Sequence, residues 1–201
     1  RTITPEFCRR AAALPNLCPH FHLSMQSGCD SVLARMNRKY DSERYYESVR
    51  LLNEAYETPG ITTDLIVGFP GETEEEFQQT LAFIRRCAFS AMHIFPYSRR
   101  PGTPADGMPG QILNSVKEER AHRAQQAALE MEAAYLDRWV GRTVPVLFEE
   151  ERDGLWRGHT TRYSEVAAPS GENLHNQLRQ VYIIGRAGNI LQGELCEGQE
   201  K

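Results

Sequence analysis

Polar side chains recur on one face of each of three predicted strands in the first hundred residues. Because side chains alternate along a strand, each strand can be divided into two faces. One face of each strand carries the following residues: His20, His22, Ser24 and Gln26 in residues 20–26, Thr62 and Asp64 in 61–67, and His93 and Tyr97 in 91–97. A strand buried on both faces of a parallel sheet is apolar throughout. Three polar faces therefore predict a wet lumen or cleft, although a single histidine of this kind can also be satisfied inside a core.

A glycine-containing turn follows each of these strands. The turns are Gln26-Ser27-Gly28, Gly68-Phe69-Pro70-Gly71-Glu72 and the segment from Tyr97 to Thr103. In α/β barrels this carboxyl edge of the sheet holds the active site, and glycine lets the backbone approach a ligand closely. Arg99 and Arg100 can clamp a carboxylate or a phosphate, or they can be solvated. The alternative for the second turn is a tight turn followed by a helix cap.

The segments around these strands predict an α/β fold with a second, smaller β domain. Helices are expected over 4–13, 41–58 and 74–87, with Thr4 and Thr73 as caps. Repeated strand–loop–helix units predict a parallel sheet with right-handed crossovers, and three strands are too few to close a barrel. A long helix follows over 115–139, and then strands over 143–150, 156–160, 165–168, 180–184 and 190–195. They predict a small antiparallel barrel, with the domain boundary between residues 137 and 138.

The composition excludes several classes of protein. The chain has 201 residues, 40% hydrophobic and 25% charged, with a net charge of −4, so it does not have the overall basic charge of many nucleic-acid-binding domains. No apolar run is long enough to span a membrane, and the cytoplasm is the expected compartment. The five cysteines are odd in number and none has C-x-x-C spacing, which argues against disulfides and against a metal site made by this chain.

Four motifs in order resemble the central barrel and tail of the radical S-adenosylmethionine methylthiotransferases. They are the segments 20–30 with 36–40, 63–73, 95–105, and 140–142 with 158–163. The last resembles TRAM, a small OB-like β-barrel that holds RNA in this family. The Ser-Arg-Arg-Pro-Gly-Thr segment and the His-Phe-His strand look most like the branch that acts on threonylcarbamoyladenosine next to the tRNA anticodon. The resemblance implies residues 1–137 as the C-terminal part of a TIM-like radical barrel and 138–201 as TRAM.

The resemblance also implies cofactors and a site. The full enzyme uses S-adenosylmethionine and two 4Fe–4S clusters, and the C-x-x-x-C-x-x-C loop for the barrel's cluster does not occur in this sequence. The chain alone is therefore expected neither to hold the cluster nor to turn over. No residue receives a catalytic role. The implied cofactor-binding residues are Ser24, Gln26, Ser27, Val67 and Gly68, and the implied lumen residues near substrate are Asp64, His93, Tyr97 and Arg100.

The implied partner is tRNA, bound through the C-terminal unit. Residues 138–201 contain eight Lys/Arg and nine Asp/Glu, a net charge of −1, whereas phosphate contacts favour a basic surface. A local face must therefore bind RNA, and its candidates are Arg157, His159, Arg162 and Tyr163; the alternative is a solvated strand edge. Two rival functions stay open: a stand-alone RNA-binding module, and a ribosomal-protein methylthiotransferase. The open edge of a half barrel predicts self-association.

Overall fold

The computed structural model describes residues 3–196. The chain divides into two compact units. The first consists of the residues up to Leu17 together with Phe21–Met131, and the second of Cys18–His20 together with the residues from Glu132 onward. Within the described part of the chain, no helix is both long and apolar enough to cross a membrane.

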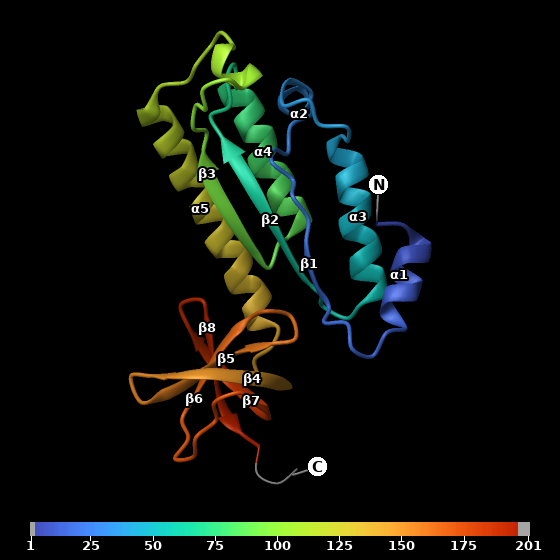
Figure 1. Cartoon of the computed structure of the whole chain (residues 1–201), viewed down its shortest axis with the longest axis vertical. Helices are drawn as coiled ribbons and strands as arrows, with labels where there is room; N and C mark the ends of the chain where they lie inside the picture. The colour runs from blue at the N-terminus through green and yellow to red at the C-terminus, as the bar shows by residue number, and fades with distance from the viewer. Residues whose placement is uncertain (1–2, 197–201) are drawn as a thin grey trace. The chain divides into compact units, whose positions relative to one another are not determined.

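The first unit contains a three-stranded sheet with strand order β1-β2-β3 (Figure 1). The strands are β1 (His20–His22), β2 (Gly60–Val67) and β3 (Ala91–Pro96). Strands β2 and β3 are parallel, with Asp64 opposite His93, as the alternation of strands and helices predicts. The sheet has β1 and β3 at its edges, and self-association through such an edge stays a prediction.

Strand β1 is shorter than the predicted 20–26, because a side chain interrupts its ladder. The Thr63 hydroxyl accepts a hydrogen bond from the Met25 N–H at 3.0 Å and donates one to the Leu23 carbonyl at 2.6 Å. Backbone pairing with β2 returns at an isolated parallel bridge between Gln26 and Leu65. Gln26 itself has a φ of +70°, so the chain turns sharply there. The sequence pattern shows the alternation of these residues but not this interruption.

The helices of the first unit are α1 (Pro5–Ala12), α2 (Asp30–Arg35), α3 (Ser42–Ala55), α4 (Glu74–Cys87) and the first part of α5 (Asn114–Asp137), with a 3₁₀ turn η1 at Pro104–Gly107. The predicted cap of α1 is confirmed, because Thr4 accepts a hydrogen bond from the Phe7 N–H. The predicted capping box of α4 is confirmed as well. Helix α3 ends at Ala55 rather than at Thr58, since the chain is already extended at Tyr56.

The core of the first unit lies between its sheet and its helices. Phe77 and Ile84 of α4 and Leu65 of β2 are fully buried in one cluster, which α3 and α5 also join. Burial of apolar surface of this kind stabilises a domain by roughly 25 cal/mol per Å². The alternate residues of β2 (Thr62, Asp64 and Ile66) are only half-buried. One sheet face is therefore apolar and packed, and the other is open to polar groups.

The second unit is a closed β-barrel with strand order β4-β5-β6-β8-β7. Its strands are β4 (Thr143–Arg152), β5 (Leu155–Thr160), β6 (Glu165–Ala168), β7 (Gln177–Ala187) and β8 (Ile190–Leu195). The expectation of a wholly antiparallel barrel is wrong at one point, because β6 and β8 pair in parallel. The buried core includes Phe148, Val181 and Leu191.

Candidate functional site

A hollow of about 520 Å³ lies at the carboxyl ends of β2 and β3. It combines polar and apolar walls, as small-molecule sites commonly do. Its lining residues are Gln26, Asp64, Ile66, Phe95, Pro96, Tyr97, Ser98, Arg100, Thr103 and Ala105. The structure thus brings four predicted site residues together here, namely Gln26, Asp64, Tyr97 and Arg100.

Strand alternation gives the hollow its apolar part. Ile66 is opposite Phe95 in the parallel register, one step beyond Asp64 and His93 on the same face. The Phe95 side chain is 51% exposed, so the strand presents an aromatic ring to the opening. The sequence analysis missed both residues. Their parity with Asp64 and His93 is the signal that could have identified them.

Next to the hollow, polar side chains of the three strands and of Ser24 form one cluster. The ring nitrogens of His22 lie 3.1 Å from the Thr62 hydroxyl and 3.2 Å from Asp64 Oδ2. The Ser24 hydroxyl is 3.5 Å from the same imidazole, and the His93 ring centroid is 6.4 Å from that of His22. Asp64 thereby orients His22 and keeps a carboxylate facing the hollow. Ser24 and His93 belong to this polar face, but they do not line the hollow itself.

The other predicted cofactor-binding residues have their polar groups engaged inside the protein. Ser27 is 1% exposed, and its hydroxyl contacts the Thr80 hydroxyl at 3.3 Å and accepts the Cys29 N–H. The Val67 carbonyl accepts the Tyr97 N–H at 2.8 Å. The Gly68 N–H donates to Glu72 Oε2 at 2.6 Å. Ser27, Val67 and Gly68 therefore support the edge of the sheet and do not line the hollow.

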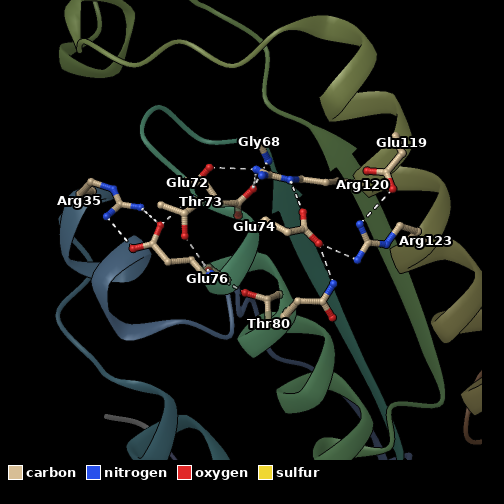
Figure 2. Close-up of polar contacts among 12 residues, drawn as sticks. Arg35, Gly68, Glu72, Thr73, Glu74, Glu76, Thr80, Glu119, Arg120 and Arg123 are labelled. Atoms are coloured by element: carbon tan, nitrogen blue, oxygen red, sulfur yellow. Dashed lines mark hydrogen bonds and ion pairs between the residues drawn. The ribbon is translucent and has the colours of Figure 1, made fainter.

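A buried ion pair fixes the turn that follows β2 (Figure 2). Arg120 Nη1 donates to Glu72 Oε2 at 2.9 Å and to the Glu72 carbonyl at 3.0 Å. The side chains of Arg120 and Glu72 are 6% and 1% exposed. Burial raises the pKa of Glu72, while the Gly68 N–H and Arg120 act in the opposite direction. Gly68 has a φ of +72°, a conformation that glycine adopts without strain.

A second ion pair holds the start of α4 to α2, also visible in Figure 2. The two terminal nitrogens of Arg35 donate to the two carboxylate oxygens of Glu76, at 3.0 and 2.5 Å. Glu76 also accepts from Ser31 and from the Thr73 N–H. These contacts, the Arg35 hydrogen bond foremost, lower the pKa of Glu76 to about 2. The first turn of α4 is thus anchored next to the turn after β2.

The two adjacent arginines after β3 differ in their environment. Arg99 Nε donates to Asp106 Oδ1 at 2.8 Å, and its guanidinium also contacts the Asp106 carbonyl. Arg100 lines the hollow and is exposed. Its guanidinium forms no ion pair with any carboxylate in the part of the chain that the structure describes. Only Arg100 is therefore available to an anionic group in the hollow.

The predicted RNA-binding residues lie close together in the β-barrel. His159 and Tyr163 stack at 4.6 Å between ring centroids, and Tyr163 is 66% exposed. Arg157 pairs with Glu165 at 2.9 Å, and His159 with Glu149 at the same distance. The Arg162 guanidinium lies 4.6 Å from the Trp139 ring. The face thus offers an aromatic stack, but its cationic groups are partly neutralised by neighbouring carboxylates.

Comparison with known proteins accounts for this arrangement. A model of the radical SAM superfamily matches residues 1–84. The threonylcarbamoyladenosine tRNA methylthiotransferase MtaB of Bacillus subtilis is 37% identical over 187 residues, which is 90% of this chain and 42% of that protein. The chain belongs to the radical SAM methylthiotransferase family.

Other relatives include both tRNA branches of the methylthiotransferases. The tRNA-2-methylthio-N(6)-dimethylallyladenosine synthase of Bacillus pumilus is 46% identical over 90% of this chain and 36% of its own length. MtaB of Thermotoga maritima is 45% identical over 73% of the chain and 34% of its own length. The chain thus spans less than half the length of these curated relatives.

A solved structure shares the fold of part of the chain. Coproporphyrinogen III oxidase (HemN) from Escherichia coli, described as a radical SAM enzyme, superposes with a TM-score of 0.53 at 20% identity. The match covers 66% of this chain and 31% of that one. At this identity the likeness concerns the fold alone, and it agrees with a partial α/β radical barrel.

The hollow offers groups that match S-adenosylmethionine, whereas the described residues form no site for an iron–sulfur cluster. S-Adenosylmethionine combines an adenine ring, ribose hydroxyls and a sulfonium cation with a carboxylate, and Phe95, Gln26 and Asp64 offer groups that match the first three. An iron–sulfur cluster needs several cysteine thiolates together. Within residues 3–196, no group of three His, Cys, Asp or Glu side chains is placed to hold a metal ion.

Proposed function

We propose that this chain is the C-terminal part of a tRNA methylthiotransferase that adds a methylthio group to C2 of threonylcarbamoyladenosine next to the anticodon. The observation that carries the proposal is the hollow at the carboxyl edge of β2 and β3, with Asp64 and Arg100 in its wall. In α/β sheets ligands bind at this edge. The names of the relatives supply the reaction class, in which both tRNA branches occur.

S-Adenosylmethionine supplies the radical chemistry of this family when it is bound. The chain's own residues bind and orient. Ile66 and Phe95 offer apolar surface to a purine and exclude water, while the Asp64 carboxylate, held by His22, faces the cationic part of the ligand. Arg100 offers a guanidinium to a carboxylate of the substrate. Since no cluster site is formed by the described residues, we derive no catalytic step from this chain alone.

Arg100 also supports the choice of substrate branch. The threonylcarbamoyl group ends in a carboxylate, whereas a dimethylallyl group carries no charge. An unpaired guanidinium in the wall of the hollow suits the first group and gains nothing from the second. The substrate is therefore proposed to be the threonylcarbamoyl form, with tRNA as the partner and the cytoplasm as the compartment.

The reaction itself can be tested with the complete reading frame. The segment upstream of residue 1 is expected to encode the C-x-x-x-C-x-x-C triad. The full protein, reconstituted with iron and sulfide, should convert threonylcarbamoyladenosine in tRNA to its 2-methylthio form, detected by nucleoside mass spectrometry. The 201-residue chain assayed in parallel should form no product. Product only from dimethylallyladenosine tRNA would contradict the proposed substrate, and an upstream frame without cysteines would contradict the enzyme.

We also propose that the β-barrel acts as a TRAM domain and binds tRNA through the His159–Tyr163 stack and its neighbours. Aromatic stacking and phosphate contacts are the usual means of holding RNA without reading its sequence. The Arg157→Ala/Arg162→Ala double variant should bind tRNA about tenfold more weakly in gel-shift titrations, since two phosphate contacts are lost. Arg152→Ala/Arg179→Ala is the control with the same change in net charge. Equal weakening by both variants would exclude this face as the binding site.

A further inference from the structure

Helix α5 buries two basic side chains one turn apart, and the proposed reaction gives neither of them a role. Lys117 is 6% exposed and Arg120 is 5% exposed. Residues three apart lie on the same side of a helix, so both face the carboxyl edge of the sheet. Burying a charge costs free energy unless it is paired. The contacts of these two residues should therefore explain what the protein gains from their burial.

Arg120 binds the end of the turn after β2, and the Glu72 side chain links that end to the start of the turn. Its guanidinium holds the carboxylate and the carbonyl of Glu72, and the same carboxylate accepts the N–H of Gly68, where the turn begins (Figure 2). The Arg120–Glu72 pair thereby ties together the two ends of the turn Gly68–Glu72. Among the residues that Figure 2 labels, Arg120 lies between this turn and Arg123. Arg123 contacts Glu119 and Glu74, and Glu74 also lies 3.6 Å from Arg120 Nε.

Lys117 and Phe69 connect the turn to the wall of the hollow, because both contact Tyr97. A Cβ atom on Gly68 would lie 2.4 Å from Lys117 Cγ, so the lysine stem packs directly on the glycine. Lys117 Nζ lies 5.4 Å from the centroid of the Tyr97 ring, within the range of a cation–π contact. Phe69, in the middle of the turn, packs edge-on against Tyr97 at 5.2 Å. Tyr97 lines the hollow, so it is held from behind by the turn and by α5.

We propose that Arg120 is a positioning residue for the hollow: paired with Glu72, it fixes the Gly68–Glu72 turn so that Phe69 and Lys117 hold Tyr97 in place for the ligand. This inference rests on the proposed function, because it takes S-adenosylmethionine as the ligand. Arg120 does not touch the ligand itself; it acts through the turn and Tyr97. A displacement of about 1 Å in a site can cost up to about a hundredfold in function.

The test combines amide hydrogen exchange, followed by NMR, with titration of the 201-residue chain by S-adenosylmethionine. In Arg120→Met the Gly68 amide should exchange at least tenfold faster and the Kd should rise about tenfold. The Ile66 amide, which donates to the Gln26 carbonyl in the strand, should keep its protection, whereas a loss of global stability would expose both amides. Arg123→Met is the control, since Arg123 is on the same helix and pairs with Glu74 but does not contact the turn.

Glu72→Gln keeps the shape of the side chain but removes its charge. This variant tests the positioning role of the Arg120–Glu72 pair if Arg120→Met does not fold. It should raise the Kd and the Gly68 exchange rate in the same sense. Faster Gly68 exchange with unchanged affinity would overturn the inference, and so would equal effects of Arg120→Met and Arg123→Met. If the unmodified chain, Arg120→Met and Glu72→Gln all bind S-adenosylmethionine with the same Kd, the inference is overturned but the proposed function is not. If the unmodified chain fails to bind, the proposed cofactor site fails as well.

Discussion

Gly158→Ala is expected to destabilise the β-barrel unit by about 3 kcal/mol, at the upper end of what overpacking in a core costs. An added Cβ would lie 2.1 Å from the Leu147 carbonyl oxygen and 2.7 Å from Phe148 Cα. Both obstacles are backbone atoms of the neighbouring strand β4, so no side-chain rotation can relieve the clash. The pairing of β4 with β5 already shifts register between Phe148 and Glu150. The added methyl group would therefore push β5 away from β4 next to this irregularity, where the two backbones are in close contact.

Urea denaturation followed by tryptophan fluorescence measures this change, because Trp139 and Trp156 both belong to the barrel core. Gly171→Ala is the matched control: nothing lies within 4 Å of the atom that it adds, and its φ is not in the left-handed region. We expect the control to change the free energy of unfolding by less than about 0.5 kcal/mol, as for other surface substitutions. A Gly158→Ala variant as stable as the control would show that β4 and β5 tolerate a wider spacing.

Glu76→Gln is expected to cost the first unit up to about 3 kcal/mol at neutral pH, because each unit of pKa shift corresponds to roughly 1.4 kcal/mol. The pKa of Glu76 falls to about 2 from an ordinary value of 4.5, chiefly through its hydrogen bond with Arg35. A depressed carboxylate pKa gives stability that is fully present above the unfolded pKa. That stability is lost as the pH falls from about 4.5 towards 2. The unmodified chain should therefore lose its advantage over Glu76→Gln across this window.

Urea denaturation followed by helical circular dichroism at a series of pH values tests this, since α1 to α4 all belong to the first unit. The raised pKa of Glu72 affects stability in the opposite sense, and taking the difference between the chain and the variant removes that contribution. Glu75→Gln, an exposed position in the same helical turn, is the control and should show no such window. A difference between chain and variant that stays constant from pH 7 to pH 2 would contradict the role assigned to the Arg35 pair.

Elements with strong local signals could be predicted from the sequence. Helix α4 begins and ends as expected because Thr73 and Glu76 form the capping box within one turn. Strands β6 and β8 have their predicted bounds, since turn residues flank both. Part of the site could be predicted in the same way. Asp64 and Tyr97 line the hollow, and the alternation of side chains along a strand is enough to place them on its face.

The features that could not be predicted are a short helix and contacts between residues far apart in the chain. Helix α2 has only six residues, too few to show a period. The end of β1 depends on the Thr63 hydroxyl, which a pattern of polar and apolar residues does not show. Arg120 and Glu72 are 48 positions apart, and each alone reads as a solvated surface charge. Only their meeting in the folded chain makes them a buried pair.

The parallel pairing of β6 with β8 has a consequence for how the protein is made. Strand β8 is inserted between β6 and β7, although it follows both of them in the chain and is therefore synthesised after them. Until then β6 has no neighbour on that side, and the ring stays open with unpaired amide and carbonyl groups that invite wrong partners. The surface around His159 on β5 thus depends on β8, and it should mature only after β8 has been synthesised and paired.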